Sequence, residues 1–485
     1  MTMLVEARDL FEQARYAEAA EACRGVLASE PESVAAMYLL GQALMQQGFP
    51  AQAAAMLAAI ADPTPAMSVD LVRALRAAGL VAEAEAVLRG ALIRGPADAG
   101  LRHAAVHSAV ERGNDALRAH DLAAAEAAYR EALALSPDCA PALGNLATAQ
   151  SAQGQVAQAL DTYRVALDLA PDDAKLGYAY ALTLLLSGAF RDGWRWQECR
   201  RRVGPMRWNY DRRPEIPQWR DGLSLAGQRV LVMSEQGFGD VIQFVRFIPC
   251  LVEQGAEVVL EVKAPLAGLF ERMPGLSATI LWDDPSPPCD IACPVLSLPL
   301  ALGLGPDDLA IRTPLIRPDD AARHRWAAWL GEGGGRRRVG LVCSGDPLHP
   351  HDAVRSIPLR ALAPLLTLPD CDFVLLQNEI RPADDIVRAG VGSLRAPAAA
   401  LNCFAETAAL IAELDLVVTI DTAVAHLAAT MGCPTWVMLR HVPDHRWLLG
   451  RDDSPWYPSV RLYRQPRHGD WDTVIDRVRH DLAKT

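Results

Sequence analysis

Two stretches of this sequence match each other at a spacing of 34 residues, and this repeat most limits how the chain can fold. His120–Pro137 reads HDLAAAEAAYREALALSP, and Gly154–Pro171 reads GQVAQALDTYRVALDLAP. Matching positions hold Ala125 and Ala159, Tyr129 and Tyr163, Leu133 and Leu167, and Pro137 and Pro171. Small Ala residues let two helices approach closely, a larger Tyr or Leu fills the groove between them, and Pro ends the second helix.

Rougher copies of the unit end at Pro31 and Pro96, and the expected turns between helices hold Gly48, Gly79, Gly154 and Gly188. These units resemble tetratricopeptide (TPR) repeats over residues 4–190. A single hairpin cannot bury its face, so the resemblance implies an N-terminal α-helical superhelix with a concave surface for a protein or peptide. Packing onto a neighbouring domain is the alternative use of that surface. About 41 residues separate Gly79 from the turn near His120, which predicts a longer loop or helix there.

Composition restricts the function classes. The chain has 59 acidic and 47 basic residues and a formal net charge of −12, which argues against a general nucleic-acid-binding protein. The start of the sequence is not that of a signal peptide, and no stretch of about 20 residues is apolar enough to span a bilayer. We therefore expect a soluble, cytoplasmic protein. Ten scattered cysteines without CxxC pairs are typical of reduced structural thiols, and we expect no metal site.

After the repeats, residues 191–226 form a join rich in Trp, Arg and Pro. We predict that its tryptophans fix the array (residues 1–190) against the next domain. They are Trp194, Trp196, Trp208 and Trp219. Stacking of exposed Arg and Trp side chains on nucleic acid is the alternative, which the acidic balance of the chain disfavours.

From residue 227 the pattern changes to that of parallel α/β domains. A buried strand, a Gly-rich turn, a helix and a second buried strand form a βαβ unit. The predicted strands are Gln228–Ser234, Ala256–Val262, Arg337–Gly345, Cys371–Gln377, Leu416–Ile420 and Pro434–Leu439, and the predicted helices include residues 404–414 and 422–430. We expect two doubly wound domains, residues 227–320 and residues 321–485 with a C-terminal helix. A ligand cleft is expected at the carboxyl ends of their strands.

Four segments, GFGDVIQFVRFIP, GLVCSGDPLHP, RSIPL and DLVVTIDTAVAHLAATMGCPTWVML, resemble glycosyltransferase family nine, the heptosyltransferase-like GT-B enzymes. The tail from His445 resembles that of bacterial proteins that fuse TPR repeats to this domain. The fold implied is α+α/β, a TPR superhelix followed by a GT-B-like pair of domains. The activity implied is metal-independent transfer of a sugar from a nucleotide-sugar, with no further cofactor. The similarity to O-linked N-acetylglucosamine transferases and to flagellin glycosyltransferases implies a protein acceptor.

The turn after the strand Leu416–Ile420 is the first candidate site. A helix N-terminus stabilises a diphosphate leaving group through its free N–H groups and its dipole. We expect the Thr422 hydroxyl and the amides of Thr422 and Ala423 to be the donors. Asp421 either caps the helix or holds sugar or ribose hydroxyls. His426, one helical turn after Thr422, either contacts a phosphate or is a hydrogen-bonded core histidine.

A second candidate segment follows the strand that begins at Arg337. Ser344 and Gly345 lie at its carboxyl end, where a small hydroxyl and a glycine let the backbone approach a phosphate. The resemblance implies a basic side chain near the donor phosphates, and Arg355, next to Ser356, is the candidate. A solvated loop charge is the alternative for Arg355. Gln377 ends another strand and is the candidate for reading the nucleotide base. His349 and His351 flank this loop without an assigned role.

The third candidate is the cleft turn that contains Gly237 and Gly239, which permit a tight turn and close approach. In heptosyltransferases the Gly–Asp of this turn supplies a carboxylate proposed as the general base, and Asp240 matches that position. A helix cap is the alternative role for Asp240. The sequence thus predicts a TPR-containing glycosyltransferase for protein hydroxyls, flagellin included. A lipopolysaccharide or small-glycan transferase and a non-catalytic scaffold are the competing hypotheses. ADP-, UDP- and CMP-linked donors stay open.

Overall fold

The structure, a computed structural model, describes residues 2–207, 210–219, 223–310, 314–332 and 334–484. The chain divides into two compact units, Met1–Pro171 and Asp172–Thr485. Within the described ranges, no helix has both the length and the apolar character needed to cross a membrane.

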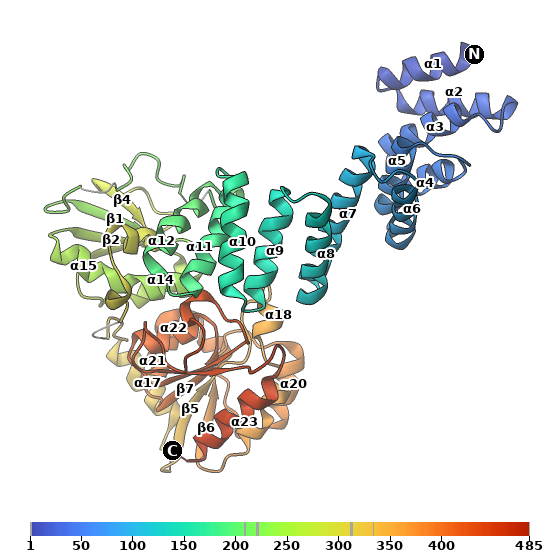
Figure 1. Ribbon diagram of the computed structural model, residues 1–485. Coiled ribbons are helices and arrows are strands. Elements are labelled where there is room, and N and C mark those ends of the chain that lie inside the picture. The colour runs from blue at the N-terminus through green and yellow to red at the C-terminus, as the bar shows by residue number, and fades with distance from the viewer. Residues whose placement is uncertain (1, 208–209, 220–222, 311–313, 333, 485) are drawn as a thin grey trace. The chain divides into compact units, whose positions relative to one another are not determined.

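The first unit consists of helices that pack against their neighbours in chain order (Figure 1). They are α1 (Thr2–Glu12), α2 (Tyr16–Ser29), α3 (Val34–Gln46), α4 (Pro50–Ala58), α5 (Pro65–Ala77), α6 (Val81–Arg94), α7 (Ala99–Arg118), α8 (Leu122–Leu135), α9 (Ala140–Ala152) and α10 (Val156–Leu169). The predicted repeat of helical hairpins is therefore confirmed.

The repeat positions have the predicted physical roles. Ala125 and Ala159 are fully buried where helices meet, and Tyr129 and Tyr163 are buried beside them. The turn glycines adopt left-handed backbone angles, with φ of 82° at Gly154. The predicted irregularity is a longer helix, because α7 has 20 residues whereas α5 and α9 have 13 each.

The second unit begins with one more hairpin, α11 (Ala174–Leu186) and α12 (Phe190–Gln197). The join follows, with the 3-10 helix η1 (Glu198–Arg202) and α13 (Gly204–Arg207). The last hairpin of the expected array thus belongs to the same compact unit as the sheets. The expected division at residues 190, 226 and 320 stays a prediction.

The first sheet is parallel, in the order β3-β2-β1-β4. Its strands are β1 (Arg229–Met233), β2 (Glu257–Val262), β3 (Leu276–Leu281) and β4 (Ile291–Pro294), and the short helices beside it include α14 (Phe238–Phe244), α15 (Ile248–Glu253) and α16 (Leu298–Ala301). On one face, Val230 and Val232 pack against α14 and α15, and on the other Leu231 and Met233 pack against Ile216 of the join. The join therefore covers a face that a helix covers in most doubly wound sheets.

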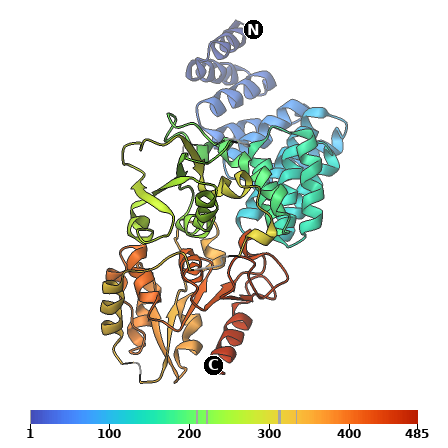
Figure 2. The same cartoon turned by 90° about the vertical axis from the view of Figure 1, so that its left-hand side faces the viewer.

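The second sheet is also parallel, in the order β6-β5-β7-β8-β9. Its strands are β5 (Arg337–Leu341), β6 (Cys371–Leu375), β7 (Leu416–Ile420), β8 (Thr435–Leu439) and β9 (Val460–Arg464). Helices lie on both sides of these strands (Figure 2). They include α17 (Asp320–Leu330), α18 (Asp352–Arg355), α19 (Ala363–Leu366), α20 (Pro382–Gly390), α21 (Phe404–Ile411), α22 (Ala423–Thr430) and α23 (Trp471–Leu482). This arrangement confirms the predicted pair of α/β domains after the helical repeats.

The predicted tryptophan contacts of the join are partly seen. Trp194 is 2% exposed and packs against Phe190, whose ring also meets that of Trp456 near the C-terminus. Trp196 contacts Tyr180 of α11 edge to face. Trp219 is half-buried and its amide donates to the Ala292 carbonyl at 2.8 Å. Trp208 lies outside the described residues.

Sequence reasoning missed the strongest anchor of the join, which is Arg200. Its side chain is fully buried and donates to both carboxylate oxygens of Glu235 at 2.9 Å. The same guanidinium donates to the Ser297 hydroxyl, and Tyr210 donates to the Glu235 carboxylate. Glu235 follows β1, so this ion pair fixes the join to the edge of the first sheet from which the cleft turn starts.

Candidate functional site

The candidate site lies where the first turns of α14 and α22 meet, each directly after the carboxyl end of a strand (Figure 1). At Gly239 a Cβ atom would lie 3.0 Å from His426 Cδ2 and 3.5 Å from the Cα of Ala423. A side chain at this position would require His426 to shift by a few tenths of an ångström, so glycine favours this close approach. The cleft turn and the donor-side turn predicted from sequence are therefore in contact.

On the donor side, β7 ends at Ile420 and α22 begins at Ala423, with Thr422 in the N-cap position. Arg355 donates to the backbone carbonyl of Asp421 at 2.9 Å, so its guanidinium lies at this turn and is not a solvated loop charge. Burial and the neighbouring carboxylate of Asp444 raise the pKa of Asp421. The turn therefore combines the free N–H groups of a helix start with an arginine, a combination suited to a phosphate.

The segment after β5 is held around Gly345. Its amide meets the Ser356 hydroxyl at 3.2 Å, and a Cβ atom there would lie 2.6 Å from Nη2 of Arg355. Gln377 donates to the Ser344 hydroxyl at 2.6 Å and accepts from the Cys343 amide at 2.9 Å. Gln377 thus braces the strand ends in this structure, and its role in reading a base stays a prediction.

The remaining residues of that loop are not part of the contact between the two turns. His349 and His351 are exposed before α18, with ring centroids 5.9 Å apart. Partial desolvation of the ring and the charge of Arg355 lower the pKa of His349. The structure assigns neither histidine a partner role at the α14–α22 contact.

On the acceptor side, the turn after β1 is strained and braced. Gln236 adopts a φ of +56°, which is costly for a residue with a side chain. The ammonium of Lys263, just after β2, donates to the Gln236 carbonyl at 2.7 Å. The Gln236 side chain donates to the Tyr178 hydroxyl of α11 at 3.3 Å. The last helical hairpin therefore reaches the cleft turn.

Asp240 occupies the third position of α14. Its Oδ2 accepts from the Gly237 amide at 2.8 Å, which is the helix-capping contact considered from sequence. Its Oδ1 forms an ion pair with Arg446, a residue of the 3-10 helix η8 (His445–Trp447) that follows β8. The capping contact is therefore present, and the second oxygen pairs with a residue that follows β8 of the second sheet.

Sequence reasoning missed the charged residues after β8. Arg446 also donates to Asp444 at 2.7 Å. Burial alone would raise the pKa of Asp444, but the charges of Arg446 and His445 outweigh it and hold that pKa well below its usual value. Burial lowers the pKa of Arg440, which directly follows β8. The sequence segment HRWLL was identified only as part of a tail that resembles other family members. Nothing in it indicated which residues its charged side chains would contact.

His426 is a buried histidine with a partner, as one of its two readings expected. It is 4% exposed, its Nδ1 lies 2.9 Å from the Tyr457 hydroxyl, and its ring stacks on Trp447. Its Nε2 lies 3.7 Å from the position a Cβ would take on Gly239, so this edge of the ring faces the cleft turn. Whether it also contacts a phosphate stays a prediction.

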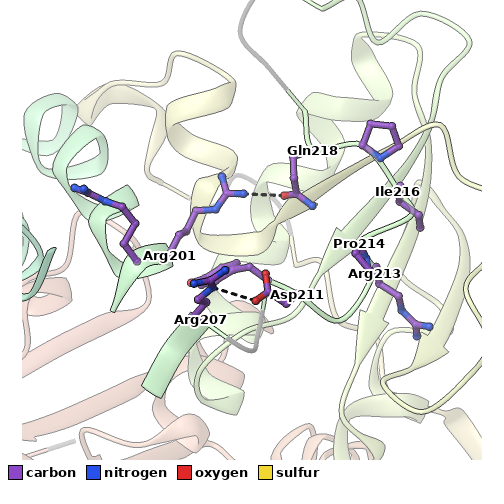
Figure 3. A pocket seen from close by; sticks show the side chains of 10 residues that line it. Arg201, Arg207, Asp211, Arg213, Pro214, Ile216 and Gln218 are labelled. Carbon is purple, nitrogen blue, oxygen red and sulfur yellow. Dashed lines mark hydrogen bonds and ion pairs between the residues drawn. The ribbon is translucent and has the colours of Figure 1, made fainter. Parts of the chain in front are cut away.

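A cavity of about 710 Å³ lies in the join, away from the predicted site residues. Four arginines line it: Arg201, Arg202, Arg207 and Arg213. In Figure 3, Arg201 points to Gln218 and Arg207 points to Asp211, with contacts of 3.3 Å and 3.2 Å. Arg213 is buried and paired with Glu261 at 2.9 Å. Most of this positive charge therefore already has a protein partner.

Two known protein families match segments of this chain. Residues 4–68, 41–99 and 110–174 match the tetratricopeptide repeat family, and residues 391–447 match glycosyltransferase family 9 (heptosyltransferase). The chain thus combines segments that match TPR repeats with a later segment that matches glycosyltransferase family 9. The family 9 match includes β7, α22 and η8, and therefore Asp421, His426 and Arg446.

Three known proteins are similar to parts of this chain. Protein FlbA of Caulobacter vibrioides is 29% identical over 383 residues, which are 72% of this chain and 62% of FlbA. The chain thus spans less than two thirds of that relative. A family 9 glycosyl transferase from Veillonella parvula is 13% identical with a TM-score of 0.39, covering 50% of this chain and 87% of its own. The ADP-heptose lps heptosyltransferase II of E. coli is 15% identical with a TM-score of 0.38, covering 53% and 99%.

Proposed function

We propose that this chain is a cytoplasmic, metal-independent glycosyltransferase of the GT-B type. It moves a sugar from a nucleotide-sugar to a hydroxyl group of a protein that its repeats bind. The observation that carries the proposal is the contact between the Gly237–Asp240 turn and the start of α22. This contact brings a carboxylate close to a helix start whose N–H groups suit a phosphate, in a chain whose residues 391–447 match family 9.

In the proposed reaction, Asp240 takes the proton of the acceptor hydroxyl. The oxygen of that hydroxyl attacks the anomeric carbon of the donor sugar. The bond from that carbon to the phosphate oxygen of the donor breaks, and the nucleoside diphosphate, or CMP from a CMP-linked donor, leaves with the bonding electron pair. The amides of Thr422 and Ala423 and the guanidinium of Arg355 stabilise the negative charge that develops on the diphosphate. These amides and this guanidinium already lie at the turn, so the stabilisation requires no rearrangement of the protein during the reaction.

The contacts of Asp240 leave it able to accept this proton. One oxygen accepts the Gly237 amide and the other pairs with Arg446. A carboxylate offers about four lone-pair sites, so an acceptor hydroxyl can still approach. The side chain is 14% exposed, which gives a substrate access without full solvation.

A polypeptide acceptor is supported by the way the last hairpin reaches the cleft. Helix α11 packs against η8, and Tyr178 on α11 contacts Gln236 of the acceptor-side turn. A protein segment bound on α11 would therefore lie near the turn that carries Asp240. Flagellin is the first acceptor to test, because the resemblance to flagellin glycosyltransferases suggests it.

A glycan acceptor is the second candidate, because the matching family is described as heptosyltransferases. In that case the repeats serve assembly only. Removing residues 1–171, a separate compact unit, distinguishes the two functions. Transfer to a glycan should survive the deletion, whereas transfer to a protein should be lost.

The direct experiment incubates the purified chain with ADP-, UDP- and CMP-linked sugars and a flagellin acceptor, and reads intact mass. We expect one donor to add the mass of its sugar, and Thr422→Ala to slow the addition by about tenfold or more, the scale of one lost transition-state hydrogen bond. Absence of any mass increase, together with no thermal stabilisation by any nucleotide, would support the scaffold hypothesis instead.

A further inference from the structure

The Arg446 side chain contacts both α14 and the residue that precedes η8. Its Nη2 pairs with Asp240, its Nε donates to the Gln243 side chain at 2.7 Å, and its Nη1 donates to Asp444 at 2.7 Å. The side chain is 12% exposed. Each of the three nitrogens of this guanidinium therefore has an oxygen partner.

These partners come from two different elements. Asp240 and Gln243 lie one turn apart on α14, beside the first sheet, and Asp444 precedes η8, after β8 of the second sheet. The backbone around Arg446 is well anchored, because the next residue, Trp447, is fully buried and stacks on His426 of α22. The guanidinium is thus held in place before any substrate arrives.

The carboxylates around Arg446 favour a positive charge at this position. Burial alone would lower the pKa of Arg446, but the carboxylates of Asp444, Asp240 and Asp421 raise it. Besides Arg446, the charged or titratable groups near Asp240 are Lys263, at the end of β2, and Tyr178, on α11. Lys263 is directed to the Gln236 carbonyl, so Arg446 is the cation in direct contact with the Asp240 carboxylate.

We propose that Arg446 is the positioning residue of the transfer reaction: it orients the Asp240 carboxylate towards the acceptor. This inference rests on the proposed function. A guanidinium suits the role because its planar fork can direct three bonds at fixed angles. The ion pair also links α14, beside the first sheet, to η8, which follows β8 of the second sheet. The position of the Asp240 carboxylate therefore depends on the donor-side segment that carries Arg446.

The test compares Arg446→Gln with Arg446→Lys and reads kcat and KM separately. For Arg446→Gln we expect kcat to fall by about tenfold or more with KM unchanged, because Arg446 acts on the base and not on substrate binding. For Arg446→Lys we expect a smaller fall in kcat, because the charge stays and only the three directed bonds are lost. Arg451→Gln is the control, since Arg451 pairs with the neighbouring surface residue Asp453.

A double-mutant cycle keeps the inference separate from the proposed activity. We expect Arg446→Gln and Asp240→Asn to lower the melting temperature non-additively, as directly paired groups do. Non-additivity without any sugar transfer by the wild type would sink the proposed function and leave the pairing intact. Additive effects, or an Arg446→Gln enzyme with the kcat of the wild type, would overturn the inference. If Arg446→Gln does not fold, Gln243→Ala replaces it, and an unchanged kcat there would also overturn it.

Discussion

The imidazole of His426 lies almost parallel to the indole of Trp447, with ring centroids 5.2 Å apart and an angle of 15° between the planes. His426 belongs to α22, whose start is the proposed phosphate site, and Trp447 directly follows Arg446. The stack therefore fixes the segment that carries Arg446 to the helix on the donor side. Burial, and then the charge of Arg446, lower the pKa of His426 well below its usual value, so this ring stays neutral in the folded protein.

This buried histidine predicts an acid-sensitive fold. Unfolded histidine takes up a proton below a pH of about 6.5, whereas folded His426 does not, so the unfolded state binds more protons there. The free energy of unfolding should fall as the pH drops below about 6.5, by up to about 1.4 kcal/mol per pH unit from this group. In His426→Asn, denaturant titrations at pH 7.5, 6.5 and 5.5 should show a smaller decrease. The exposed His480→Asn is the control, and an equal decrease in all three proteins would contradict the prediction.

The buried ion pair of the join predicts a large loss of stability when it is broken. Arg200→Met leaves the Glu235 carboxylate buried beside Tyr210 without its cation. Removing one partner of a buried pair costs about 3–5 kcal/mol, which urea titration would measure. Arg195→Met is the matched control, because Arg195 pairs with Asp192 on the surface and exposed pairs contribute at most about 1 kcal/mol. Equal losses in both variants would show that Arg200 does not anchor the join.

Gly345 predicts a defect in donor binding without a defect in folding. A Cβ atom at this position would lie 2.6 Å from the Arg355 guanidinium and would push it from the turn at Asp421. We expect Gly345→Ala to weaken binding of the nucleotide that the wild type binds by about tenfold, as measured by calorimetry. This is the scale of one lost charge-assisted hydrogen bond. Gly392→Ala is the control, since none of the described atoms outside its neighbours lies within 4 Å of a Cβ there. Equal affinities in both variants would remove Arg355 from the phosphate site.

Much of the fold could be predicted because its signals are local. The hairpins follow from Ala, Tyr, Gly and Pro at fixed spacing, and β7 was predicted with its observed bounds, Leu416–Ile420. The strand from Arg337 was predicted four residues too long, because its buried run continues past the last paired residue. Three strands were missed: β3 is half-exposed, β4 has four residues ending in Pro294, and β9 alternates with Arg.

The candidate site was predictable only in its local parts. The turns at Asp240 and Thr422 each follow a strand and start a helix, a pattern visible in a short window of sequence. The partner of Asp240 is Arg446, 206 positions away, and no periodicity links the two. Lys263 meets the Gln236 carbonyl only because β1 and β2 are neighbours in the sheet. Such contacts depend on the tertiary fold, so the sequence alone did not indicate them.

The most direct test of the account is the single-turnover rate of sugar transfer by Asp240→Asn, measured by intact mass with the donor and acceptor that the wild type uses. Asparagine keeps an oxygen for the Gly237 amide, so the cap of α14 persists, but it cannot accept the proton of the acceptor hydroxyl. We predict a rate about 10²–10⁴-fold below that of the wild type, the usual contribution of a general base. A rate within about threefold of the wild type would contradict the role of Asp240 and the mechanism built on it.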